Sequence, residues 1–125
     1  MVFLDANVIL EITLKDRLYF DQASQFLETV NDDTTISLLT VHLVMHFGRQ
    51  AGIADELLER VIGENELLSI TPEDYVWAVL NEKGKDFEDA LQVATAIRNR
   101  CDSFITFDTD LAKAYAGFPI EIIIP

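Results

Sequence analysis

The 125-residue sequence contains few basic residues, a single cysteine and no long apolar run. Nine Lys and Arg residues stand against 22 Asp and Glu residues, and the resulting formal net charge of −13 argues against tight non-specific binding of nucleic acid. Cys101 cannot form an internal disulfide and has no zinc pattern around it, as is typical of a reducing compartment. Because no stretch is long enough to span a bilayer and no signal peptide precedes Val2, we expect a cytoplasmic protein without a membrane role.

The acidic balance does not exclude a nuclease. A metal-dependent site needs clustered carboxylates, and bound divalent cations reverse the local field that a phosphate meets. The alternative interpretations of the charge are a well-solvated surface or a surface for a basic protein partner. Half of the residues are hydrophobic, so the chain can bury one core, and it is too short to divide comfortably into two. We therefore expect one domain over residues 1–125.

Short apolar runs near residues 2, 35, 68, 105 and 122 alternate with segments of helical periodicity. This alternation is typical of an α/β protein, and we expect a three-layer α/β/α sandwich with a mainly parallel sheet of about five strands. The expected strands cover residues 2–4, 34–37, 67–70, 104–107 and 120–124. The expected helices cover residues 6–14, 18–30, 40 to about 48 or 52, 55–62, 71–80 and 86–98. Thr40 is the expected cap of the third helix, and a break at residues 81–85 is expected after the fifth helix. Periodicity leaves the strand order open.

Four aspartates lie where strands end or helices begin. Asp5 and Asp108 end two apolar strands, Asp110 lies two residues beyond Asp108, and Asp89 falls in the first turn of an amphipathic helix. Ligands of open parallel sheets bind beyond the carboxyl ends of the strands, so these four side chains can converge. Clustered carboxylates repel one another, and their convergence implies a compensating cation such as Mg²⁺ or Mn²⁺.

Each of these aspartates also has a simpler interpretation. Asp89 suits the positive end of a helix dipole, and Asp108 can cap a helix. Asp5 can be a turn residue, and Asp110 can be a solvated residue of a first turn. The metal interpretation therefore rests on the coincidence of four positions and not on any one of them.

Four short motifs, three of which contain these aspartates, occur in a fixed order along the chain. They are Asp5-Ala6-Asn7 after the first strand, Ser37 and Thr40 before a helix, Asp86-Phe87-Glu88-Asp89-Ala90 before an alanine-rich helix, and Thr106-Phe107-Asp108 after a strand. Together they resemble the PIN domain family, and within it the VapC-type toxin ribonucleases of toxin–antitoxin pairs. The resemblance covers the whole chain.

The resemblance implies a metal-dependent endoribonuclease that hydrolyses a phosphodiester to a 5′-phosphate and a 3′-hydroxyl. It also implies an RNA substrate, a homodimer, and a VapB-like antitoxin with a segment that reaches the acidic site. The implied metal ligands and catalytic residues are Asp5, Asp89 and Asp108, with Asp110 as a supporting ligand and with Asn7 and Thr106 positioning the site.

Position 43 departs from the family pattern, which has a glutamate three residues after the threonine. This chain has Leu43 there, so one carboxylate is missing and the activity would be weakened. His42 and His46 are four residues apart and are candidates for a metal pair, although polar residues on the outer side of an amphipathic helix are the stronger interpretation. Glu11 and Glu88 are further candidates to replace the missing carboxylate.

Three classes of function remain open at this point. The first is a PIN-type ribonuclease that acts as a toxin. The second is a catalytically degenerate PIN fold that binds a protein partner, which the missing glutamate and the negative charge both favour. The third is another Mg²⁺-dependent phosphohydrolase that uses Asp108 and Asp110, but Asp5-Ala6-Asn7 lacks the Asp-x-Asp that we would expect after the first strand of such an enzyme.

Overall fold

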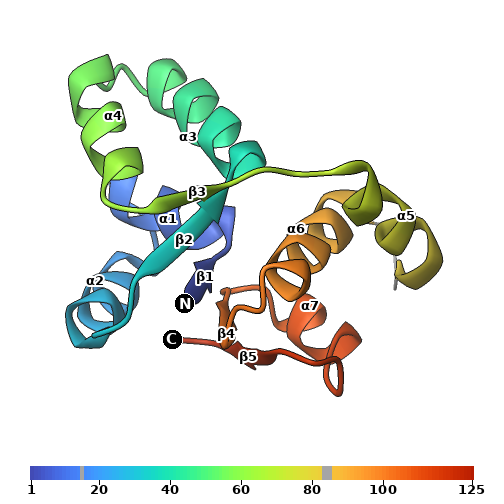
Figure 1. Ribbon diagram of the computed structural model, residues 1–125. Helices are drawn as coiled ribbons and strands as arrows, with labels where there is room; N and C mark the ends of the chain where they lie inside the picture. The colour runs from blue at the N-terminus through green and yellow to red at the C-terminus, as the bar shows by residue number, and fades with distance from the viewer. Residues whose placement is uncertain (15, 83–85) are drawn as a thin grey trace.

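The computed structural model describes residues 1–14, 16–82 and 86–125. Over these ranges the chain forms five strands and seven helices (Figure 1). The strands are β1 Val2–Leu4, β2 Thr34–Ser37, β3 Glu66–Leu68, β4 Ser103–Ile105 and β5 Glu121–Ile123. The helices are α1 Ala6–Thr13, α2 Phe20–Thr29, α3 Leu38–Gln50, α4 Asp55–Gly63, α5 Pro72–Asn81, α6 Phe87–Arg98 and α7 Thr109–Ala114.

All five strands pair in parallel, in the order β3-β2-β1-β4-β5. The chain starts at the central strand β1, builds one half of the sheet through β2 and β3, and then crosses over to build the other half. The strand order therefore reverses between β1 and β4, which is where ligands bind in sheets of this kind. Leu4 is opposite Ile105 in the register, so the residues that follow β1 and β4 meet at the same edge.

Helices cover both faces of the sheet, and the predicted three-layer sandwich is confirmed. In Figure 1, α1 to α4 lie on one side of the strands and α5 to α7 on the other. Side chains alternate between the faces of a strand, so Val2 and Leu4 join the core on the α1 side, whereas Phe3 joins the core on the α6 side. Phe3 stacks on Phe104 of the neighbouring strand with ring centroids 5.1 Å apart.

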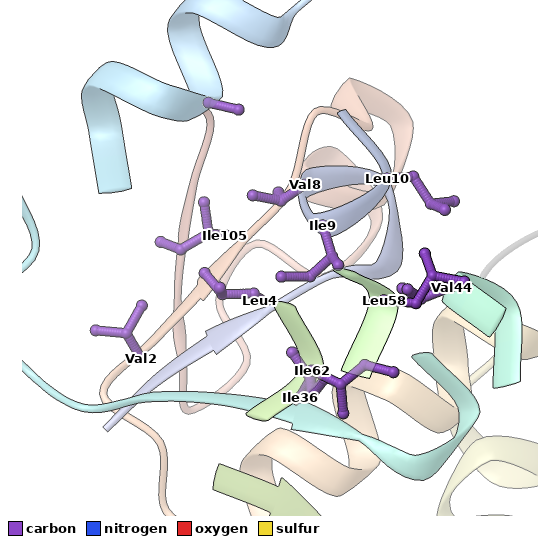
Figure 2. Close-up of a cluster of buried hydrophobic side chains, with 11 residues drawn as sticks. Val2, Leu4, Val8, Ile9, Leu10, Ile36, Val44, Leu58, Ile62 and Ile105 are labelled. Carbon is purple, nitrogen blue, oxygen red and sulfur yellow. The ribbon is translucent and has the colours of Figure 1, made fainter. Parts of the chain in front are cut away.

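The core on the α1 side holds α1 against the sheet. Figure 2 shows Val8 and Ile9 of α1 lying with Leu4 of β1 and Ile105 of β4. Each of these four side chains is at most 1% exposed. Complete burial of an aliphatic side chain of this size contributes about 1.5–3 kcal/mol. This packing fixes the first turn of α1, which follows directly from β1 at the sheet edge.

Two element boundaries differ from the prediction for local hydrogen-bonding reasons. Helix α3 begins directly after Ser37, whose hydroxyl oxygen accepts the Thr40 N–H at 3.2 Å, so the predicted cap at Thr40 is wrong. Strand β4 ends at Ile105 and not at Phe107, because the Phe107 N–H bonds to the Asn7 side chain instead of continuing the ladder.

Helix α7 was not among the predicted helices, and α2 is shorter than the predicted segment 18–30. The predicted break at residues 81–85 falls mostly outside the described residues. Where the structure describes the chain, no helix combines the length and the apolar character needed to cross a bilayer.

Candidate active site at the carboxyl edge of the sheet

Asp5 lies between β1 and α1 at the point where the strand order reverses. Its carboxylate caps α1 by accepting the Ala6 N–H at 2.7 Å, and its own N–H donates to the carbonyl of Ile105 in β4 at 2.9 Å. The side chain is 5% exposed. A carboxylate buried to this degree is costly unless hydrogen-bond donors surround it. Thr106 of the loop after β4 and Asn7 of α1 supply two of them through the contacts described next.

Thr106 and Asn7 hold the Asp5 carboxylate in place. The Thr106 hydroxyl donates to Asp5 Oδ2 at 2.7 Å, and Asn7 Nδ2 donates to the same oxygen at 3.1 Å. Asn7 Oδ1 in turn accepts the Phe107 N–H at 3.1 Å, and Thr106 Oγ1 accepts the Asp108 N–H at 3.0 Å. This network couples the end of β1 to the loop after β4 and fixes the orientation of the buried carboxylate.

Asp108 caps α7, which confirms that it can serve as a helix cap. Its Oδ1 accepts the N–H groups of Asp110 and Leu111 at 2.9 and 3.0 Å. The cap engages one carboxylate oxygen, and a carboxylate has a second oxygen for another donor or a cation. Asp110 is exposed in the first turn of α7, where its backbone takes part in this cap.

Asp89 reaches the same edge from a helix. It lies in the first turn of α6, where Asp86 caps the helix by accepting the Asp89 N–H at 3.3 Å. Helix α6 leads into the start of β4, so it runs from the carboxyl edge of the sheet toward the amino edge. The half-buried Asp89 side chain therefore belongs to the edge that also carries Asp5 and Asp108.

Two aspartates at this edge, Asp5 and Asp89, have raised pKa values. Burial raises the pKa of Asp5 to about 6, and the negative charges of Asp108 and Glu88 contribute to the rise. Burial is also the largest cause that raises the pKa of Asp89, to about 7. The negative charges of neighbouring acids contribute after it, with Asp5 first among them and Asp108 included. Asp108 thus acts on both raised carboxyls, so the three acids share one electrostatic environment.

The donors at this edge are carboxylate oxygens, which are the ligands that Mg²⁺ and Mn²⁺ prefer. Their charge and chemistry therefore suit a hard divalent cation, which would relieve the repulsion that raises the two pKa values. Among residues 1–14, 16–82 and 86–125, however, no three His, Cys, Asp or Glu side chains are arranged to hold a metal ion together. The sharing of one cation by Asp5, Asp89 and Asp108 that the sequence led us to expect therefore stays a prediction.

A buried polar network beside the acids was missed by the sequence analysis. The Ser37 hydroxyl donates to Gln92 Oε1 at 2.5 Å, and Gln92 Nε2 donates to Thr40 Oγ1 at 2.8 Å. All three side chains are fully buried. Gln92 lies one turn after Asp89, so the network ties the start of α3 to the acidic turn of α6. The signal in the sequence was a glutamine between Ala90 and Val93 on an otherwise apolar helix face.

Position 43 lies one turn after Thr40 on the same face of α3, and Leu43 is half-buried there. His42 and His46 are both exposed, and their rings stack with centroids 6.1 Å apart. The two histidines therefore occupy the outer side of an amphipathic helix, which was the stronger interpretation.

The two other glutamates considered for the missing carboxylate differ in their surroundings. Glu11 is 7% exposed, its Oε2 accepts the Tyr19 N–H at 2.9 Å, and its Oε1 lies 3.4 Å from Arg17 Nε. It is therefore engaged by the segment between α1 and α2. Glu88 is exposed, and its charge contributes to the raised pKa values of both Asp5 and Asp89. Only Glu88 of this pair shares the electrostatic environment of the acids.

The sequence of the chain matches the PIN domain family over residues 2–117. The matched segment includes β1, α6 and β4, with all of the acids described above. The chain therefore belongs to the PIN domain family. Among curated proteins, no sequence match was found.

Solved structures of other proteins share this fold at low sequence identity. A toxin–antitoxin complex from Klebsiella pneumoniae is 23% identical with a TM-score of 0.79, over 98% of this chain and 96% of that chain. The sarcin–ricin-loop-cleaving toxin VapC20 of Mycobacterium tuberculosis is 14% identical with a TM-score of 0.74, over 91% and 95% of the two chains. FitAcB of Neisseria gonorrhoeae is 21% identical with a TM-score of 0.74, over 98% and 96%. At these identities the likeness shows the fold.

The raised pKa values predict how stability depends on pH. Between about pH 4 and 7 the folded protein holds more protons on Asp5 and Asp89 than the unfolded chain does, so these groups make stability fall as the pH rises. Asp89→Asn removes one of the two groups and part of the repulsion on the other. The loss of unfolding free energy between about pH 5 and pH 8, measured by urea denaturation, should be smaller in this variant than in the parent.

The control for this measurement is Glu28→Gln, which removes one exposed negative charge at the end of α2. Its pH dependence should match that of the parent. An Asp89→Asn variant whose stability falls with pH as steeply as the parent would contradict the shared electrostatic environment.

Proposed function

We propose that this protein is a metal-dependent endoribonuclease and the toxin of a type II toxin–antitoxin pair. The observation that carries the proposal is the buried Asp5 at the strand-order reversal of a PIN domain, within reach of the charge of Asp108. Among the similar structures, VapC20 is described as a toxin that cleaves the sarcin–ricin loop, and the Klebsiella pneumoniae structure is described as a toxin–antitoxin complex. These descriptions support RNA as the substrate class for this chain.

In this proposal Asp5, Asp89 and Asp108 hold Mg²⁺ or Mn²⁺, with Asp110 in support. A bound cation supplies charge to offset a phosphate under attack and lowers the pKa of water. Thr106 and Asn7 position Asp5, because both donate to Asp5 Oδ2. Because the pKa values of Asp5 and Asp89 are raised to about 6 and about 7, metal binding at or below neutral pH displaces protons from these carboxyls and strengthens as the pH rises.

The first prediction concerns metal binding and cleavage together. Mn²⁺ should raise the melting temperature, and at a hundredfold excess over the dissociation constant the added stability is about 2.7 kcal/mol. Asp5→Asn combined with Asp108→Asn should abolish this shift and lower Mn²⁺-dependent cleavage of a single-stranded RNA by at least about 100-fold. Thermal melting and a gel assay of the RNA products are the measurements.

A control for the double variant is Asp55→Asn with Asp102→Asn, which also removes two negative charges but at exposed positions away from the site. It should keep both the melting shift and the cleavage. A Mn²⁺ shift that persists in Asp5→Asn/Asp108→Asn would place the metal elsewhere in the protein.

The proposed antitoxin binds the acidic edge through arginine or lysine. Basic side chains can replace a cation beside carboxylates and form charge-assisted hydrogen bonds. Binding of a VapB-like protein encoded next to this gene should therefore weaken as salt increases from about 0.05 to 0.5 M, measured by calorimetry. The proposal would be contradicted by an affinity that is indifferent to salt and to Asp5→Asn/Asp108→Asn.

The proposed homodimer has a candidate surface on α5. Tyr75, Val76, Val79 and Leu80 expose between 54% and 76% of their surface on this helix, whose other face packs on α6. Adjacent apolar residues exposed to this extent are typical of interaction surfaces. Val79→Glu should convert a dimer to a monomer in light scattering, whereas Leu57→Glu, on the exposed side of α4, should not. A parent chain that is monomeric at high concentration rules the dimer out.

The second candidate function, a catalytically degenerate PIN domain that binds a partner, is favoured by Leu43. The variant Leu43→Glu separates the two candidates, because it restores the family carboxylate on the helix face that carries Thr40. Since Ser37 and not Thr40 caps α3, the substitution completes no capping box, and any gain must come from the site. For an active nuclease we predict tighter Mn²⁺ binding and faster cleavage than in the parent.

The matched control is Leu43→Gln, which has the same shape without the charge. Both variants lose part of the burial energy of leucine, which is about 1.5–3 kcal/mol for a fully buried side chain and less for this half-buried one. A folded Leu43→Glu variant whose Mn²⁺ affinity and cleavage rate rise no more than those of Leu43→Gln would falsify the assignment of position 43 to the acidic site. If the parent cleaves RNA at a rate that Leu43→Glu does not improve, Glu88 takes the role of the missing carboxylate. Glu88→Gln is then the test.

A further inference from the structure

An aromatic pair lies directly beside the acidic edge. The ring of Tyr19, from the segment that leads into α2, stacks on the ring of Phe107 with centroids 4.9 Å apart and an interplanar angle of 9°. Phe107 stands between Thr106 and Asp108 in the loop after β4. Tyr19 remains 39% exposed although one face of its ring covers Phe107. An accessible aromatic ring thus packs against Phe107, the residue that directly precedes the proposed metal ligand Asp108.

Both rings are fixed to the site by hydrogen bonds of their own backbones. The Tyr19 N–H donates to Oε2 of the buried Glu11 at 2.9 Å, and the Phe107 N–H donates to Asn7 Oδ1 at 3.1 Å. Asn7 in turn donates to the Asp5 carboxylate, so the pair is tied to the same network that orients the site. The buried Glu11, which the nuclease site does not use, therefore has a positioning role.

We propose that the exposed face of Tyr19 is a stacking platform for one unstacked base of a single-stranded RNA whose phosphate meets the acidic edge. Stacking suits this chain because it attracts a base without any positive charge, and the net charge of −13 leaves little basic surface for RNA. Sequence-specific and sequence-tolerant RNA binding both use aromatic rings against splayed-out bases. Arg17, 41% exposed beside Glu11, is close in sequence and can approach the same nucleotide.

This inference rests on the proposed ribonuclease function for its choice of RNA. The competing occupant of the ring is a side chain of a protein partner. The position of the pair favours RNA, because Phe107 is flanked on both sides by residues of the acid network, where the sugar–phosphate chain of a substrate has to pass.

The test measures binding apart from cleavage. A short single-stranded oligoribonucleotide carrying one 2-aminopurine is titrated with the protein in Ca²⁺, a cation chosen to fill the site without promoting hydrolysis. Stacking on Tyr19 should quench the 2-aminopurine fluorescence. Tyr19→Ala should weaken binding about tenfold, equivalent to about 1.4 kcal/mol, and should remove the quenching. Tyr19→Phe should retain both, because it keeps the ring and loses only the hydroxyl.

The matched control is Leu18→Ala, which removes an apolar side chain that is 81% exposed next to Tyr19 but carries no ring. Its affinity should stay within about twofold of the parent. Glu11→Gln, which keeps an acceptor for the Tyr19 N–H, should also retain quenching. Melting curves establish whether each variant is folded. If Tyr19→Ala does not fold, the comparison of Tyr19→Phe with the parent still decides the test.

Several results overturn the stacking platform. One is a Tyr19→Ala variant with the affinity and quenching of the parent, and another is a Tyr19→Phe variant that loses as much affinity as Tyr19→Ala. The others are a parent protein that does not bind RNA, and a Tyr19→Ala variant that loses binding to the antitoxin but not to RNA. The outcome is separable from that of the proposed function. Quenched RNA binding with no metal-dependent cleavage supports the platform and contradicts the nuclease, whereas cleavage with unchanged affinity in Tyr19→Ala does the reverse.

Discussion

The buried carboxylate of Asp5 is the constraint on which the candidate site depends. A carboxylate that is 5% exposed at the end of a central strand needs donors, and Ala6, Asn7 and Thr106 provide them. Because Thr106 directly follows β4, its hydroxyl reaches Asp5 only when β1 and β4 are neighbours in the sheet. The strand order, the first turn of α1 and the loop after β4 are thus parts of one arrangement, and the acids of α6 and α7 are placed around it.

Much of this arrangement could be read from the sequence because its signals are local. Apolar runs that end in aspartate predict strands with acids at one edge, and this placed Asp5 correctly at the end of β1, whereas Asp108 lies beyond the end of β4 as the cap of α7. The strand order could not be predicted, because it depends on pairing between segments that lie far apart in the chain. The cap at Ser37 was missed because threonine, like serine, is a favoured capping residue, and only the path of the backbone after β2 decides between Ser37 and Thr40.

The polar contacts of the core were the least predictable feature. Gln92 reads as one polar residue on an apolar helix face, and its partners Ser37 and Thr40 lie 55 and 52 residues away in the sequence. Glu11 was considered as a substitute ligand, yet it anchors Tyr19 and Arg17. Leu43 leaves the acidic edge with one carboxylate fewer than the family pattern, so the balance between nuclease and degenerate binding domain depends on whether Asp5, Asp89 and Asp108 suffice to hold a cation.

The most direct measurement of that central claim is anomalous X-ray scattering from crystals of the protein grown with Mn²⁺. The account predicts one strong anomalous peak at the carboxyl edge of the sheet, with oxygen atoms of Asp5, Asp89 and Asp108 at about 2.1–2.3 Å from it. Crystals without a peak at this edge, or with a peak only between His42 and His46, would contradict the account.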